Sequence, residues 1–262
     1  MMKEQIHIFF AALMFYTGLP CPKWATHDPH YLNRATVYFP LIGWIVGFLA
    51  FAGFWLASLL FSPMIAVIFS MVVSIFTTGA FHEDGFADTC DGFGGGWTKE
   101  KILTIMKDSR IGTYGATGLI FILGLKAVSL YEIAWWMDLP GMLFSFITAH
   151  SVSRSAAATT LYTHVYCREN DDSKAKPLAT KMNLSDLLIV LGLGLAPLIL
   201  FSIITSNYFL LLIPIPVYLI KMAMAKYFKK WIGGYTGDCL GAIQQVTEVV
   251  VYLCLLIIWK YT

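Results

Sequence analysis

Residues 64–96 read MIAVIFSMVVSIFTTGA followed directly by FHEDGFADTCDGFGGG. The first part, 64–80, has the length and apolar composition of a membrane-spanning helix. The second part places four carboxylates, those of Glu83, Asp84, Asp88 and Asp91, within nine residues. Clustered like charges repel one another, and a carboxylate near hydrocarbon is costly. The stretch therefore predicts a helical membrane protein that holds a cation at the end of one span.

The spacing of these carboxylates indicates which cation. If the helix runs on through the acidic stretch, Asp84, Asp88 and Asp91 lie within about 60° of one another on one face. Glu83 lies about 100° from Asp84, beside that face. Oxygen ligands without His or Cys spacing favour magnesium, which usually also holds substrate phosphates. The alternative, a solvated acidic cap on a helix, leaves the glycines at 85, 92 and 94–96 unexplained.

Composition places the whole chain in the membrane class. Hydrophobic residues make up 58% and charged residues 13% of the 262 residues, against about 45–50% and 25% in soluble domains. A net charge of +2 gives no reason to expect nucleic-acid binding. The five cysteines are scattered without CxxC spacing, which predicts neither a disulfide framework nor a zinc site.

The apolar runs predict an all-α, polytopic integral membrane bundle that forms one domain over residues 1–262. About seven spans are expected, at 37–61, 64–80, 111–137, 142–166, 184–204, 208–228 and 242–259. Residues 6–19 are apolar but short, and predict an interfacial or re-entrant helix. Pro214 and Pro216 are expected to kink the sixth span.

Loop charges predict the orientation. Lys and Arg occur before the first span and in the loops at 82–110, 167–186 and 221–241, whereas the turns at 61–63, 138–140 and 205–207 have none. By the positive-inside rule the charged loops are cytoplasmic and the C-terminus is outside. The candidate chemistry then faces the cytoplasm.

Basic side chains near the acidic stretch predict phosphate binding. Lys107 and Arg110 stand three residues apart, so that both could grip a pyrophosphate; the alternative is a positive anchor beside the next span. Arg154 lies within a span, four residues after His150, and is interpreted as a substrate-facing cation, with a hydrogen-bonded interhelical pair as the alternative. Lys126 and Glu248 are expected to form a structural pair.

A second glycine-rich loop, GGYTGDCLG at 233–241, precedes the last span. Asp238 in this loop is a candidate metal ligand or base, and the alternative is a turn in which Asp238 caps the following helix. The loop at 167–186 is interpreted as a mobile lid.

Three blocks of sequence, HEDGFADTCDGFGGG, IMKDSRIGTYG and GGYTGDCLGAIQQ, occur in this order. Together they make the chain resemble the cobalamin synthases, the adenosylcobinamide-GDP ribazoletransferase family, over nearly its whole length. The resemblance implies a magnesium-dependent enzyme, multi-pass in the bacterial (or archaeal) cell membrane, with Mg²⁺ held by Glu83, Asp84, Asp88 and Asp91. It implies adenosylcobinamide-GDP and alpha-ribazole, or its 5′-phosphate, as substrates, with GMP as a product and the lipid bilayer as surroundings. A homo-oligomer is compatible with these patterns.

Such a reaction depends on positioning and charge neutralisation. Asp84, Asp88 and Asp91 are expected to act through the metal, and Lys107, Arg110 and Arg154 to neutralise the phosphates. Asp238 and Asp108 are the candidate bases.

Two other functions fit parts of the sequence. Residues 88–92, DTCDG, match the opening DxxDG of the CDP-alcohol phosphotransferases, but the later elements of that motif are missing. A cation-coupled transporter would also use an acidic membrane site, yet no internal repeat is evident and the acids lie at a helix end.

Overall fold

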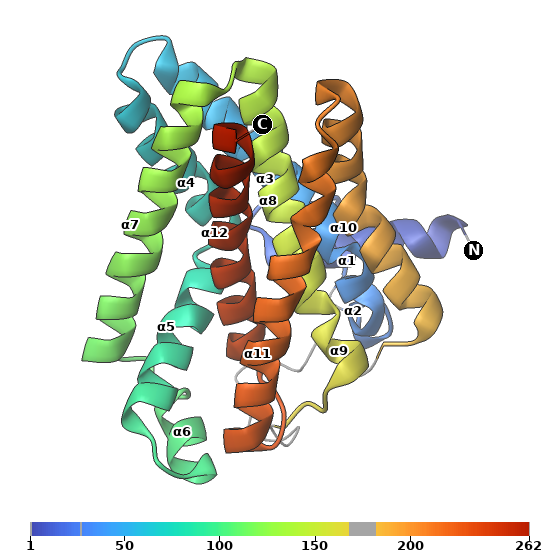
Figure 1. Ribbon diagram of the computed structural model, residues 1–262. Coiled ribbons are helices and arrows are strands. Elements are labelled where there is room, and N and C mark those ends of the chain that lie inside the picture. The colour runs from blue at the N-terminus through green and yellow to red at the C-terminus, as the bar shows by residue number, and fades with distance from the viewer. Residues whose placement is uncertain (1, 27, 168–181, 262) are drawn as a thin grey trace.

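The computed structural model describes residues 2–26, 28–167 and 182–261, and this part of the chain is helical without a strand. The long helices run along one common direction (Figure 1). They are α3 (Phe39–Ser58), α4 (Pro63–Thr78), α7 (Thr113–Trp136), α8 (Leu139–Ala158), α10 (Leu184–Thr205), α11 (Pro214–Ile232) and α12 (Gly237–Tyr261). The shorter elements are α1 (Met2–Tyr16), α2 (Pro29–Ala35), η1 (Thr36–Tyr38), α5 (Phe81–Gly95), α6 (Lys99–Ile105), α9 (Thr160–Thr163) and η2 (Tyr208–Leu212). The predicted all-α membrane bundle is confirmed.

Fewer helices than predicted have a membrane-spanning composition. Within the described residues, five segments are long and apolar enough: Pro29–Ser58, Thr113–Trp136, Leu184–Thr205, Tyr208–Ile232 and Gly237–Tyr261. Counting α4 and α5 as one broken span gives six, against about seven predicted. The predicted span at 142–166 accounts for the difference, because α8 carries many Ser and Thr residues as well as His150 and Arg154. Since α8 packs against α3, α10 and α12, its surroundings are protein rather than lipid.

The acidic stretch forms a separate helix. Gly79 and Ala80 adopt left-handed conformations, with φ of 62° and 56°, and α5 leaves α4 at an angle of 88°. The Ala80 N–H donates to the Ile75 carbonyl, which closes the end of α4 as glycine-containing helix ends commonly do. The preceding helix therefore does not continue through residues 81–96, but α5 keeps the helical spacing of the carboxylates.

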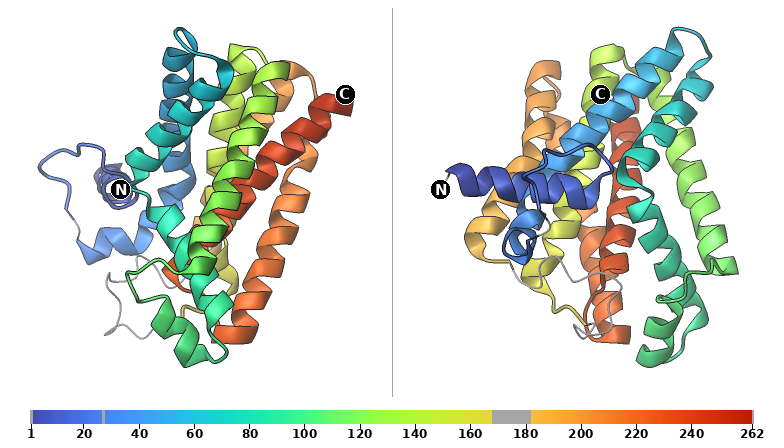
Figure 2. Two further views of the ribbon diagram at one scale, coloured as in Figure 1. Left: turned by 90° about the vertical axis from the view of Figure 1, so that its left-hand side faces the viewer. Right: turned by 180° about the vertical axis from the view of Figure 1, so that it is seen from behind.

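Two other segments can be compared with their predictions, the start of α11 and the N-terminal helix α1. The sixth predicted span is divided at Ile213 into η2 and α11. Pro214 is the first residue of α11 and both prolines lie in its first turn, where the missing N–H needs no partner. Helix α1 has 15 residues, too few for about 30 Å of hydrocarbon. It lies across the bundle (Figure 2), in agreement with an interfacial or re-entrant helix.

The charged and the uncharged connections between helices lie at opposite ends of the bundle, as the loop charges predict. The described parts of the charged connections, at 96–112, 164–167 and 233–236, lie at one end of the bundle (Figure 1). The α3–α4, α7–α8 and α10–α11 turns and the C-terminus lie at the other end. Helices α5 and α6 belong to the charged end, so the acidic stretch and the basic residues share it.

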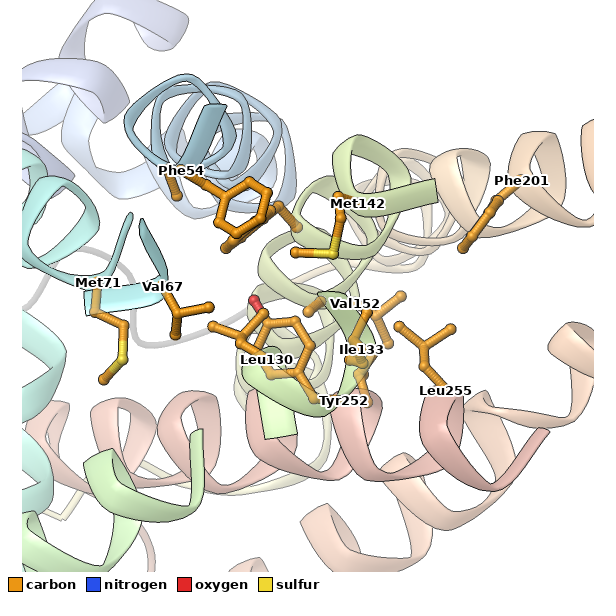
Figure 3. Packing of buried hydrophobic residues seen from close by; sticks show 14 of the residues in the cluster. Phe54, Val67, Met71, Leu130, Ile133, Met142, Val152, Phe201, Tyr252 and Leu255 are labelled. Carbon is orange, nitrogen blue, oxygen red and sulfur yellow. The ribbon is translucent and has the colours of Figure 1, made fainter. Parts of the chain in front are cut away.

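Buried hydrophobic side chains from several helices pack together in a core (Figure 3). It contains Phe54, Val67, Leu130, Phe201 and Leu255, drawn from five different helices. Burial of such side chains stabilises a membrane protein through close packing rather than through removal of water.

Helices α3 and α8 approach each other closely at Gly47. A Cβ on Gly47 would lie 2.8 Å from the Ile147 Cα and 2.9 Å from the Phe146 carbonyl oxygen. We expect Gly47→Ala to destabilise the protein by about 1–3 kcal/mol, because backbone atoms cannot move aside without separating the helices. Thermal unfolding in detergent measures this. Gly124→Ala, at a helical position with no neighbour within 4 Å, is the control, and equal melting temperatures for both variants would contradict the packing argument.

Candidate functional site

The four carboxylates of helix α5 differ in their exposure to solvent. Asp84 is exposed and Asp88 is half-buried, whereas the Glu83 and Asp91 residues are only 7% and 9% exposed. The helix packs against both α7 and α12. Consequently only part of the acidic stretch faces outward.

Asp91 is bound by the start of α7. Its carboxylate accepts hydrogen bonds from the Gly112 N–H at 2.7 Å and from the Gly115 N–H at 2.8 Å. A Cβ on either glycine would collide with this carboxylate. Asp91 therefore satisfies two N–H groups that the first turn of α7 leaves without intrahelical partners, and its charge suits the positive end of the helix dipole.

Asp238 lies beside the acidic helix at the start of α12. Its backbone packs on Gly85, where a Cβ would be 3.0 Å from the Asp238 Cα. The Asp238 carboxylate accepts a 3.4 Å hydrogen bond from the Thr236 hydroxyl and is half-buried. The two glycine-rich blocks of the sequence thus meet, and they bring Asp238 next to the turn of α5 that contains Asp84 and Asp88.

The connection between α6 and α7 carries the basic residues. Arg110 is exposed, and its guanidinium donates to both carboxylate oxygens of Asp108, with the closest contact at 2.6 Å. Hydrogen bonding to Asp108 raises the pKa of the Arg110 guanidinium. A cleft of about 500 Å³ opens here, lined by residues of α5, of this connection and of α7: Asp91, Gly95, Ile105, Asp108, Arg110, Ile111, Gly112, Thr113 and Tyr114.

A buried ion pair occupies the centre of the bundle. The Lys126 Nζ lies 2.5 Å from Glu248 Oε1, and both side chains are almost fully buried. This confirms the predicted pairing of α7 with α12. Gln244 also donates to Glu248, at 2.5 Å.

Arg154 belongs to the same interior. It is 1% exposed, donates to the Nδ1 and the carbonyl of His150, and lies over the Phe39 ring at 5.6 Å. The same His150 Nδ1 lies 3.3 Å from Glu248 Oε2, so His150 stands between Arg154 and the buried carboxylate. The expectation that Arg154 faces the substrate does not match this position. The surrounding helices cover it, as the hydrogen-bonded alternative requires, although its partner lies on the same helix.

The cobalamin-5-phosphate synthase family matches residues 8–256. The chain belongs to the cobalamin-5-phosphate synthase family. Among curated proteins, the adenosylcobinamide-GDP ribazoletransferase of Shewanella frigidimarina is 42% identical over 97% of this chain and 95% of its own. That of Shewanella oneidensis is 44% identical over 97% and 95%. No solved structure matches the chain.

As a member of the cobalamin-5-phosphate synthase family, the chain is a membrane transferase. Its described residues contain no group of three or more His, Cys, Asp or Glu side chains that could hold a metal. Glu83 and Asp91 are bound within the protein, whereas Asp84 and Asp88 lie one helical turn apart toward the surface. Two carboxylates suffice for a magnesium ion that also binds waters and substrate phosphates. The residues therefore fit such an ion, and they do not form a ready four-carboxylate site.

The sequence analysis missed Gln244 and Gln245, which link this synthase's acidic helix to its interior. Gln245 donates to Glu83 Oε1 at 2.9 Å and to Gln244 Oε1 at 3.0 Å. The available signal was a pair of amides in an otherwise apolar span, four residues and three residues before Glu248. The predicted lid falls mainly on residues 168–181, which lie outside the described residues.

For Asp91 the structure predicts a structural effect in this synthase. Asp91→Asn removes the charge and one of the two acceptor oxygens, so we expect a loss of about 2 kcal/mol of stability. Thermal unfolding of the detergent-solubilised protein measures the loss. Asp84→Asn makes the same chemical change at an exposed position and should melt as the wild type does; an unchanged melting temperature for Asp91→Asn would refute the anchoring role.

Proposed function

We propose that this chain joins adenosylcobinamide-GDP to alpha-ribazole, or to its 5′-phosphate, in a magnesium-dependent reaction that releases GMP. The names of its relatives and the three sequence blocks support this substrate pair. The observation that carries the proposal is the meeting of α5 with the start of α12, which gathers Asp84, Asp88 and Asp238 at the charged end of the bundle.

The proposed reaction is a phosphoryl substitution. A ribose hydroxyl of alpha-ribazole forms a new bond to the phosphorus that remains attached to cobinamide, and the anhydride bond to GMP breaks. Asp84 and Asp88 would hold magnesium, which would also bind the pyrophosphate. Bound magnesium supplies the positive charge that stabilises the phosphate oxygens and the departing GMP.

The other residues take roles that follow from their positions. Lys107 and Arg110 lie in the α6–α7 connection, beside the cleft, and neutralise the remaining phosphate charge. The proton of the attacking hydroxyl passes to Asp238, which lies beside the turn of α5 that contains Asp84 and Asp88. Arg154 does not contact the substrate in this proposal, because its side chain is buried inside the bundle.

The charged end, which carries these residues, faces the cytoplasm in this proposal. Lys and Arg are concentrated in the connections at this end, and such residues mark cytoplasmic loops. The protein then lies in the bacterial cell membrane with its nucleotide-binding end exposed to cytoplasmic substrates.

A GMP-release assay tests the function. Purified, detergent-solubilised protein is incubated with adenosylcobinamide-GDP and either form of alpha-ribazole, with and without magnesium. We expect GMP and a corrinoid product in equal amounts with magnesium, and loss of both when EDTA removes it. No release from folded protein with either nucleophile would refute the function, and release that persists in EDTA would refute the metal dependence.

A further inference from the structure

Glu83 stands between the acidic motif and the interior of the bundle. It directly precedes Asp84, yet its residue is 7% exposed, whereas Asp84 is exposed. A carboxylate in such a place is costly unless hydrogen bonds or opposite charges compensate it. Glu83 therefore needs specific partners within the protein.

Gln245 of α12 is that partner. Its amide donates to Glu83 Oε1 at 2.9 Å and to Gln244 Oε1 at 3.0 Å. Gln244 donates in turn to Glu248, which pairs with Lys126 of α7. A continuous series of buried hydrogen bonds thus joins α5 to the central ion pair.

The backbones of α5 and α12 lie in close contact at two glycines. A Cβ on Gly241 would lie 3.1 Å from the His82 carbonyl oxygen, and one on Gly85 would lie 3.0 Å from the Asp238 Cα. Close contact of two backbones fixes the distance between the helices. The rotation of α5 about its own axis is then set by the side chains that point into the interface, and Glu83 is one of them.

This rotation determines where the outward carboxylates point. At about 100° per residue, Asp84 lies about 100° from Glu83 around the helix, and Asp88 lies about 140° from it. Holding Glu83 inward therefore presents Asp84 and Asp88 on the outer side, about 40° apart.

We propose that Glu83 and Gln245 are positioning residues: their buried hydrogen bond fixes the rotation of α5 and thereby places Asp84 and Asp88 for metal and phosphate binding. Glu83 is then not itself a metal ligand. The inference rests on the proposed function of Asp84 and Asp88, and it assigns Gln245, on a different helix, to the same site.

A double-mutant cycle tests the pair. Glu83→Gln, Gln245→Glu and the swapped Glu83→Gln/Gln245→Glu protein are compared with Gln245→Met, which keeps the side-chain shape but cannot donate. Tyr252→Phe removes a buried polar group from the same helix, at a position where the hydroxyl has no partner among the described residues, and serves as the control. Three readouts are taken for each protein: the melting temperature, the Kd for Mn²⁺ by electron paramagnetic resonance, and the magnesium concentration that gives half-maximal GMP release.

We expect Glu83→Gln, Gln245→Glu and Gln245→Met to weaken Mn²⁺ binding by about tenfold, as changes to groups that orient metal ligands commonly do. The magnesium requirement should rise in parallel. The swapped protein can form the same hydrogen bond with donor and acceptor exchanged, so it should recover most of the loss. Tyr252→Phe should match the wild type.

Three results would overturn the assignment. One is wild-type Mn²⁺ affinity and magnesium requirement in the three single variants. Another is a swapped protein as weak as Glu83→Gln, because that would make Glu83 a metal ligand. The third is a lower melting temperature without any change in Mn²⁺ binding. A wild-type protein that binds Mn²⁺ but releases no GMP would instead refute the proposed function, while the Mn²⁺ comparison would still decide the role of Gln245.

Discussion

Replacing Asp88 with asparagine is expected to lower magnesium-dependent GMP release by about a hundredfold or more, and Asp84→Asn should have an effect of the same order. Both side chains lie on the outward part of α5, where Asp84 is exposed and Asp88 half-buried. An amide oxygen carries no full charge, so it binds magnesium less strongly than a carboxylate does. Asparagine has nearly the same shape as aspartate, so the folded structure should tolerate both changes. The rate of GMP release as a function of magnesium concentration measures the loss.

The control for these variants is Glu100→Gln. Glu100 is an exposed carboxylate in α6 at the same end of the protein, so this variant makes the same change in net charge. Wild-type rates are expected for it. If Asp84→Asn and Asp88→Asn also retain wild-type rates and magnesium dependence, the metal site lies elsewhere even though GMP is released.

Replacing Lys126 with methionine should destabilise the protein by about 3–5 kcal/mol, because it leaves the buried Glu248 without its cation. The Lys126 and Glu248 side chains are 3% and 0% exposed and their charged atoms are 2.5 Å apart. Gln244 and His150 also contact Glu248, but Gln244 is uncharged and the His150 Nδ1 is shared with the Arg154 guanidinium. Denaturation monitored by circular dichroism in detergent measures the effect.

A double variant distinguishes two causes of lost stability: the loss of the lysine side chain itself, and the unpaired buried charge left on Glu248. Lys126→Met/Glu248→Gln removes both charges, and we expect it to be more stable than Lys126→Met alone. Lys230→Met, at an exposed position, controls for the loss of one positive charge. A single variant at least as stable as the double variant would show that the pair does not balance a buried charge.

Several features could be predicted from local sequence. Runs of apolar residues identify spanning helices because hydrocarbon excludes unsatisfied backbone groups. The distribution of Lys and Arg among the connections predicted which connections lie at the same end of the bundle. Lys126 and Glu248 were predicted to pair because two opposite charges in apolar spans have few other ways to avoid an isolated buried charge.

Other features depended on neighbours that sequence does not identify. Arg154 was expected to face substrate, but α3 and α8 meet so closely at Gly43 and Gly47 that the arginine is enclosed. The predicted span at 142–166 was polar because it lies inside the bundle, where other helices shield it from lipid. Neither packing can be derived from the residues of α8 alone.

The sequence by itself determined that this protein is a helical membrane protein with an acidic stretch at the end of one span, because length, hydropathy and residue spacing are local properties of the chain. Only the tertiary structure decided which carboxylates of that stretch point outward. Gln245 turns Glu83 inward and the start of α7 binds Asp91, so Asp84 and Asp88 are left toward the surface. The physical reason is that a helix has no preferred face until neighbours from distant parts of the chain cover some of its sides and satisfy the polar groups buried there.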